Sequence, residues 1–158
     1  MSEMNQIFRE FAVAFAGALD NAKPICFRER LDCESLDLSL DSLKSVDRYL
    51  AYLHKHKKKL DDEEWQSTVL YCGAYIGEVI RNETDNAYNW IDYDDYIPNN
   101  PELQKLIPQR SVATCAFIVN DDGKMMMPMN KVARFIDEGV ENSVHYFAKV
   151  CMVDDEDA

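Results

Sequence analysis

Apolar residues recur at spacings of three and four between residues 65 and 81, which is the pattern of one buried helix face. The residues on this stripe are Trp65, Val69, Cys72, Ile76, Val79 and Ile80. Asp61 or Asp62 stands where an N-cap is favourable, and Arg81 places positive charge near the final carbonyls. We therefore expect a central helix over residues 65–81, around which the rest of the chain is organised.

Further segments show helical periodicity or helix-boundary residues, and others show strand-like composition. The helical segments are 3–21, 41–59, 101–107, 128–138 and 141–151, and the strand segments are 87–93, 111–119 and 124–128. The pair Asp122-Gly123 predicts a hairpin between the last two strands. The expected fold class is α+β, with about five or six helices packed on a small antiparallel sheet of about three strands. The order of the strands is left open.

The chain has 158 residues, a length at which one hydrophobic core buries most of the unfolded surface. We expect a single globular domain over residues 1–153 and a short acidic tail over 154–158. The net charge of −12, from 29 acidic and 17 basic residues, repels the phosphates of nucleic acids and of anionic membranes. Neither is an expected partner. The basic run at 54–59 is interpreted as a complement to the negative end of its own helix.

Five cysteines occur without a Cys-x-x-Cys pair, and an odd number of thiols does not suit a disulfide framework. No apolar run reaches the length of a membrane span, and the amino-terminal segment lacks the net positive charge of a signal peptide. These features favour a cytoplasmic protein.

Gly73 and Gly77 are unusual inside a helix, because each costs about 1 kcal/mol relative to alanine. They indicate close packing of another backbone, and the alternative is a ligand that approaches the helix. Glu78 follows them in an apolar setting. It fits a buried hydrogen-bond acceptor for a strand or for Trp90, and the rival interpretation is a general base whose pKa is raised by desolvation.

Residues 82–104, which we call the acidic segment, hold six acidic residues and no lysine or arginine. The candidate partner-binding residues within it are Glu83, Asp85, Tyr88, Trp90, Asp92, Tyr93, Asp94, Asp95 and Tyr96. Tyrosine and tryptophan are common interface anchors, and carboxylates steer basic partners. A solvated acidic loop is the simplest alternative. A divalent metal site at Asp92, Asp94 and Asp95 is a further one, although the glycine and glutamate of an EF-hand are missing at the required offsets.

One stretch resembles the signature of an uncharacterised bacterial family of small domains: it reads GAYIGEVIR at residues 73–81 and is followed nine residues later by Trp90. The similarity extends over about the last two-thirds of the chain, through SLKSVDRYL upstream and VARFIDEGVENSVHYF downstream. The resemblance implies a fold but no activity. Some small acidic bacterial proteins of this kind are immunity proteins against toxins of contact-dependent inhibition systems, an association that implies a toxin domain as partner.

No nucleophile elbow, phosphate-binding loop, dinucleotide fingerprint or paired-cysteine zinc motif is present. We therefore predict no catalytic residue, no cofactor and no metal. The leading hypothesis is a non-enzymatic, acidic protein-binding module, an immunity or inhibitor protein that occludes a basic toxin domain through the acidic segment. Two rivals stay open: a small hydrolase-type enzyme with Glu78 as its base, and an oligomeric scaffold such as a homodimer built through the methionine-rich strand near residues 125–127.

Overall fold

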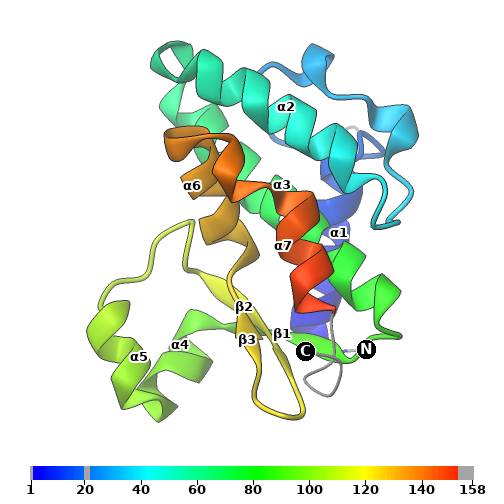
Figure 1. Ribbon diagram of the computed structural model, residues 1–158. Helices are drawn as coiled ribbons and strands as arrows, with labels where there is room; N and C mark the ends of the chain where they lie inside the picture. The colour runs from blue at the N-terminus through cyan, green and yellow to red at the C-terminus, as the bar shows by residue number, and fades with distance from the viewer. Residues whose placement is uncertain (1, 20–21, 153–158) are drawn as a thin grey trace.

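A long helix, α3 (Asp62–Glu83), forms the centre of the computed structural model, which describes residues 2–19 and 22–152 (Figure 1). Within these residues the chain forms seven α-helices and one three-stranded sheet. The other helices are α1 (Glu3–Phe15), α2 (Leu43–Lys55), α4 (Tyr93–Tyr96), α5 (Pro101–Leu106), α6 (Pro128–Glu138) and α7 (Val144–Cys151). The strands are β1 (Tyr88–Asp92), β2 (Ala116–Asn120) and β3 (Met125–Met126). The expected α+β class is confirmed, with one helix, α4, beyond the predicted helical segments.

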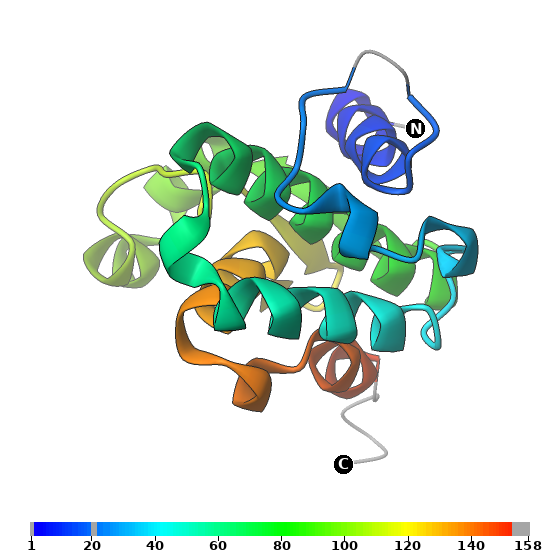
Figure 2. The same cartoon turned by 90° about the horizontal axis from the view of Figure 1, so that it is seen from above.

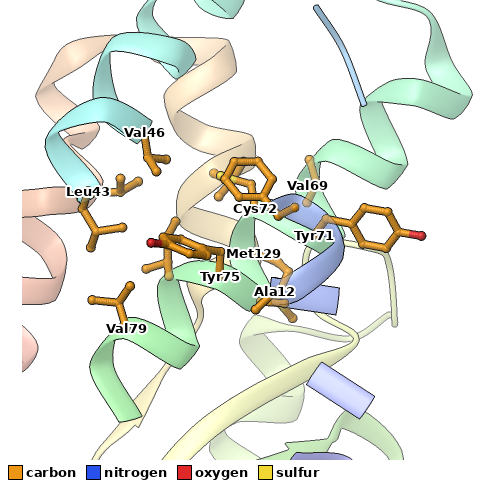
Figure 3. Close-up of a cluster of buried hydrophobic side chains, with 14 of the residues drawn as sticks. Ala12, Leu43, Val46, Val69, Tyr71, Cys72, Tyr75, Val79 and Met129 are labelled. Carbon is orange, nitrogen blue, oxygen red and sulfur yellow. The ribbon is translucent and has the colours of Figure 1, made fainter. Parts of the chain in front are cut away.

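The central helix α3 is buried on most of its circumference because it lies between two layers of helices. α1 packs against one side, and α6 and α7 pack against the other, with α2 in contact with both α6 and α7 (Figure 2). Cys72 and Tyr75 of α3 lie in one apolar cluster with Leu43 of α2 and Met129 of α6 (Figure 3). The helix predicted at the centre of the chain is confirmed, but the single stripe seen in the sequence accounts for only part of its buried surface.

The two glycines of α3 are points where other elements approach its backbone closely. A Cβ at Gly73 would lie 2.5 Å from Cγ and 2.7 Å from Cα of Met129 in α6. One at Gly77 would lie 2.2 Å from Cζ2 of Trp90 in β1. Because any larger residue would overlap these atoms, glycine is what allows α6 and β1 to pack so near to α3. The predicted close approach of another backbone is confirmed at Gly73, whereas at Gly77 the close neighbour is the indole ring of Trp90.

The sheet has the order β1-β2-β3, and both pairs are antiparallel. In the first pair Trp90 lies opposite Ile118, and β2 and β3 form the hairpin predicted around residues 120–123. Gly123 has a φ of 84° in this turn, which glycine adopts without steric cost. At the free edge of β1, the backbone N–H of Trp90 donates to Oδ1 of Asn5 in α1 at 2.8 Å. This contact satisfies a donor that the outer edge of a sheet would otherwise leave open.

Some predicted boundaries are wrong by a turn or more. The first helix ends at Phe15 instead of residue 21, because Gly17 takes a φ of 84°. β2 begins at Ala116 instead of residue 111, since the segment before it forms a turn in which the N–H of Thr114 donates to the carbonyl of Ser111. Residues 20 and 21 and the tail expected at 154–158 lie outside the described residues.

The sheet separates the main core from a second, smaller apolar cluster. Tyr93, Ile97 and Phe117 are buried in this cluster, and α4 and α5 lie beside the sheet to enclose it (Figure 1). Single-turn 3₁₀ helices complete the secondary structure of the described residues; they are Arg28–Arg30, Cys33–Ser35, Lys57–Lys59, Ile97–Asn99 and Val140–Asn142. The main core therefore sits among the helices, and the acidic segment winds around the sheet below it.

The basic run at 54–59, which begins in the last turn of α2, contacts the end of a neighbouring helix. Nζ of Lys57 donates to the carbonyl oxygen of Asp137 at 2.8 Å. Nδ1 of His54 lies 2.9 Å from the carbonyl oxygen of Ile136. Both carbonyls belong to the last turn of α6, where the helix dipole places partial negative charge. The run therefore stabilises the C-terminal end of α6 in addition to the helix in which it begins.

Candidate functional site

Three aromatic side chains of the acidic segment are buried, which corrects the expectation that they form a binding surface. Tyr88 and Trp90 are each 3% exposed, and Tyr93 is 8% exposed. Side chains of a strand alternate between its faces, and Tyr88 and Trp90 occupy the positions of β1 that face the main core. Tyr93 belongs to the second cluster. These rings hold β1 and α4 in place and are not available to a partner.

The other six candidates lie at the surface to differing degrees. Glu83, Asp85, Asp94 and Asp95 are exposed, and Asp92 and Tyr96 are half-buried. The ring of Tyr96 packs on Phe117 with 5.6 Å between the ring centroids. Five of these six candidates are therefore carboxylates, and the sixth is a partly covered tyrosine.

These carboxylates do not form one surface, because β1 separates them into two groups. Glu83 and Asp85 precede the strand, whereas Asp92 is its last residue and Asp94 and Asp95 follow it. A five-residue strand spans roughly 15 Å at the usual rise of about 3.3 Å per residue. Figure 1 shows the loop after α3 and the helix α4 at opposite ends of the sheet. The predicted continuous patch is thus two separate acidic regions.

The region after β1 is partly neutralised by an arginine from outside the acidic segment. Nη1 of Arg110 donates to Oδ2 of Asp92 at 2.7 Å and to Oδ2 of Asp94 at 3.0 Å. The hydrogen bond from Arg110 lowers the pKa of the Asp92 carboxyl, which also caps α4 by accepting from the N–H of Asp94. Asp95 and Glu102 add exposed negative charge on α4 and α5. We call Asp94, Asp95 and Glu102 the α4–α5 carboxylates.

Glu78 is fully buried, and hydrogen-bond donors occupy both of its carboxylate oxygens. Nη1 of Arg81 donates to Oε1 at 3.1 Å and to Oε2 at 2.9 Å, and Nε1 of Trp90 donates to Oε2 at 2.9 Å. Nη1 of Arg9 reaches Oε1 at 3.3 Å. A carboxylate inside a protein is tolerated when it is paired in this way. The predicted role of Glu78 as a buried acceptor for Trp90 is confirmed.

The same geometry does not suit a general base. A base must reach the substrate proton directly or through one water, whereas the side chain of Glu78 is 0% exposed. Tyr75, which lies three residues before Glu78 on α3, directs its hydroxyl to Oγ of Ser42 at 2.7 Å, and this hydroxyl accepts from the N–H of Leu38 at 3.0 Å. The interpretation of Glu78 as a catalytic base therefore gains no support from its surroundings.

The cysteines form no disulfide in the described residues, and those whose pKa is shifted are not reactive thiols. All five are free, and burial raises the pKa of the Cys72 thiol well above its ordinary value and that of Cys151 to about 11. Thiols with a raised pKa hold little thiolate at neutral pH and are weak nucleophiles. In residues 2–19 and 22–152, no three His, Cys, Asp or Glu side chains are grouped in a way that could hold a metal ion.

Several hollows lie away from the acidic segment, and two of them, which the sequence did not predict, adjoin α3 or α1. One, of about 520 Å³, is partly lined by Trp65 between the start of α3 and α6. The other, of about 240 Å³, lies between α1 and residues 36–38 and includes Arg9 in its lining. One feature of the sequence could have indicated the second hollow. Arg9, Ala12 and Ala16 are spaced three and four residues apart, so on a helix the cation lies at the end of a stripe of small residues.

Comparisons of the chain with known protein families, with curated proteins and with solved structures give no match. The resemblance to an uncharacterised bacterial family therefore stays a prediction. In the part of the chain that the structure describes, no helix combines the length and the apolar character that crossing a bilayer requires.

Proposed function

We propose that the protein is a non-enzymatic, acidic protein-binding module whose partner carries a basic surface. The form that the resemblance suggests is a cytoplasmic immunity or inhibitor protein that occludes a basic toxin domain. One observation carries the proposal: the α4–α5 carboxylates are exposed in a chain of net charge −12, whereas the buried carboxylate of Glu78 is fully paired inside the core.

The mechanism relies on charge more than on aromatic anchors, because Tyr88, Trp90 and Tyr93 are inside the protein. Exposed carboxylates raise the rate at which a basic partner is encountered and fix its orientation. Tyr96, the one half-buried ring of the segment, lies between Asp95 and the start of the following turn and is the remaining candidate for an apolar contact. Binding would cover the partner's basic site without any chemical turnover.

A comparative capture experiment tests the proposal. The wild-type chain, the triple variant Asp94→Asn/Asp95→Asn/Glu102→Gln and a matched control are immobilised and exposed to lysate of the source cells. The control neutralises three exposed carboxylates of the connector between α1 and α2, which lies at the far end of the molecule from α4 and α5 (Figure 1). Its substitutions are Glu29→Gln, Asp32→Asn and Glu34→Gln.

We expect mass spectrometry to find a basic protein that the wild type and the control retain and the triple variant loses. Equal retention by all three chains would remove the α4–α5 carboxylates from the proposal. Loss from both variants would show that only the total charge matters and that no particular surface is used.

The rival oligomeric scaffold has a weaker structural basis. Met125 and Met127 pack against the second apolar cluster, and Met126 packs against the main core. The methionine side chains are therefore partly buried within the chain, although β3 is an edge strand of the sheet. We expect a monomer in sedimentation velocity at high concentration, and a stable dimer would favour the scaffold.

A further inference from the structure

An apolar groove runs along a partly buried side of α1, next to the connector that leads to α2. Ala12, Val13 and Ala16 of α1 form one wall, and Leu36 and Leu38 of the connector form the other. The groove has a volume of about 240 Å³. At about 30 Å³ for each water-sized group, it holds roughly eight non-hydrogen atoms.

One positive charge lies at this groove and is surplus to the internal ion pairs. Arg9 lines the groove and contacts Glu78, which Arg81 already pairs through both of its oxygens. Two guanidinium groups and one carboxylate give this cluster a net charge of +1. The side chain of Arg81 is 5% exposed, whereas that of Arg9 is 42% exposed, so the surplus charge faces solvent at Arg9.

The other polar side chains that line the groove are Asp37, whose exposed carboxylate carries one negative charge, and Tyr75. The carboxylate of Asp37 accepts from both the N–H and the hydroxyl of Ser39. The hydroxyl of Tyr75 is bonded to Ser42 and to the N–H of Leu38. The described contact of Arg9 uses Nη1 alone, and a guanidinium carries further N–H donors that can bind a second carboxylate.

We propose that this groove binds a small aliphatic carboxylic acid, with its carboxylate on Arg9 and its hydrocarbon chain along Ala12, Val13 and Ala16. An apolar cleft with one convergent charged group is the usual form of a small-ligand site. The site is independent of the acidic partner surface, because α1 and its connector lie apart from α4 and α5 (Figure 1).

A titration with three six-carbon probes tests the charge requirement on the wild-type protein. Hexanoate, hexan-1-ol and hexylammonium share a chain length and differ in the charged or neutral end. We expect saturable hexanoate binding, with ¹H–¹⁵N NMR shifts centred on the amides of Val13, Ala16 and Leu38. Hexan-1-ol should bind about tenfold or more weakly, because it lacks the charge-assisted hydrogen bond, and hexylammonium should bind most weakly.

Two variants and a control test the residues. Arg9→Gln should weaken hexanoate binding about tenfold or more and leave hexan-1-ol binding nearly unchanged. Ala16→Leu should block both probes by filling the groove. Arg134→Gln removes the same charge from a residue of α6 that pairs with Glu138, and should bind hexanoate like the wild type. Thermal unfolding of each variant checks that it is folded.

Equal binding of hexanoate and hexan-1-ol, shifts centred outside the groove, or the absence of saturable binding would each overturn the proposal. Tighter binding of N-acetylleucine than of hexanoate would also reject the proposed ligand class. It would indicate that the groove binds the C-terminal residue of a peptide instead of a free aliphatic acid. A folded Arg9→Gln variant with unchanged hexanoate affinity would also reject the assigned role of Arg9.

Discussion

Two carboxylate sites on the two sides of β1 behave in opposite ways. Glu78, on the core side, is enclosed and receives hydrogen bonds from Arg81, Trp90 and Arg9. Asp94 and Asp95, after the strand, are exposed to solvent. A buried charge depends on each of its partners, whereas exposed charges act together and individually contribute little to stability. The same residue chemistry therefore serves the fold at one site and remains open to solvent at the other, where Asp94 and Glu102 make only exposed ion pairs with Arg110 and Lys105.

The largest effect is expected when Glu78 loses its main partner. Arg81→Leu removes the bidentate pair and also the hydrogen bond from Nε of Arg81 to the carbonyl oxygen of Tyr88. The uncompensated buried charge should lower the free energy of unfolding by about 3–5 kcal/mol. Chemical denaturation by urea measures the change. The matched variant Arg9→Gln, at a half-exposed position, should cost less than about 1 kcal/mol, and an equal loss in both variants would contradict this account.

The next effect tests how closely β1 approaches α3. Gly77→Ala places a Cβ 2.2 Å from Cζ2 of Trp90, so the strand must shift even though alanine favours the helix. We expect a net loss of about 1–3 kcal/mol in unfolding free energy. In a double-mutant cycle, the same change in a Trp90→Phe background should cost less, because the overlapping ring atoms are absent. Strict additivity of the two changes would show that this contact is not the cause.

A smaller effect is expected at the exposed pair on the other side of the strand. Arg110→Gln should lower the free energy of unfolding at neutral pH by no more than about 1 kcal/mol, because both partners are partly solvated. Arg110 lowers the pKa of Asp92 in the folded state, so its contribution is present above the unfolded pKa of about 4 and is lost as the pH falls through the lowered folded value.

The difference between wild type and Arg110→Gln should therefore be constant from pH 7 to about 5 and shrink below pH 4. Urea unfolding at a series of pH values measures it. A difference that grows on acidification would have the wrong sign for a lowered carboxyl pKa.

Features that depend on spacing within one segment were predictable from the sequence. The limits of α3 follow from its caps and apolar period, and Gly73 and Gly77 indicated close approach because they are unfavourable without it. The pairing of Glu78 with Trp90 was one of the alternatives that the sequence left open, since a carboxylate among apolar neighbours needs a donor.

Features set by distant contacts were not predictable in this way. Alternation along β1 is the same whether Tyr88 and Trp90 face solvent or core, and the packing of α1 and α3 decides between them. Arg110 neutralises Asp92 from 18 residues away. Arg9 meets Glu78 from 69 residues away, so neither the surplus charge nor the groove beside it could be recognised from one sequence.

The most direct test of the central claim is the salt dependence of association with the captured basic partner. At low salt, the triple variant Asp94→Asn/Asp95→Asn/Glu102→Gln should associate with the partner about tenfold more slowly than the wild type. Its association rate should change little between roughly 50 and 300 mM salt, a range over which screening weakens exposed charges. A folded Glu78→Gln variant should associate like the wild type. Wild-type rates in the triple variant at every salt concentration, or lost binding in folded Glu78→Gln, would contradict the claim that the exposed carboxylates, and not the buried one, recognise the partner.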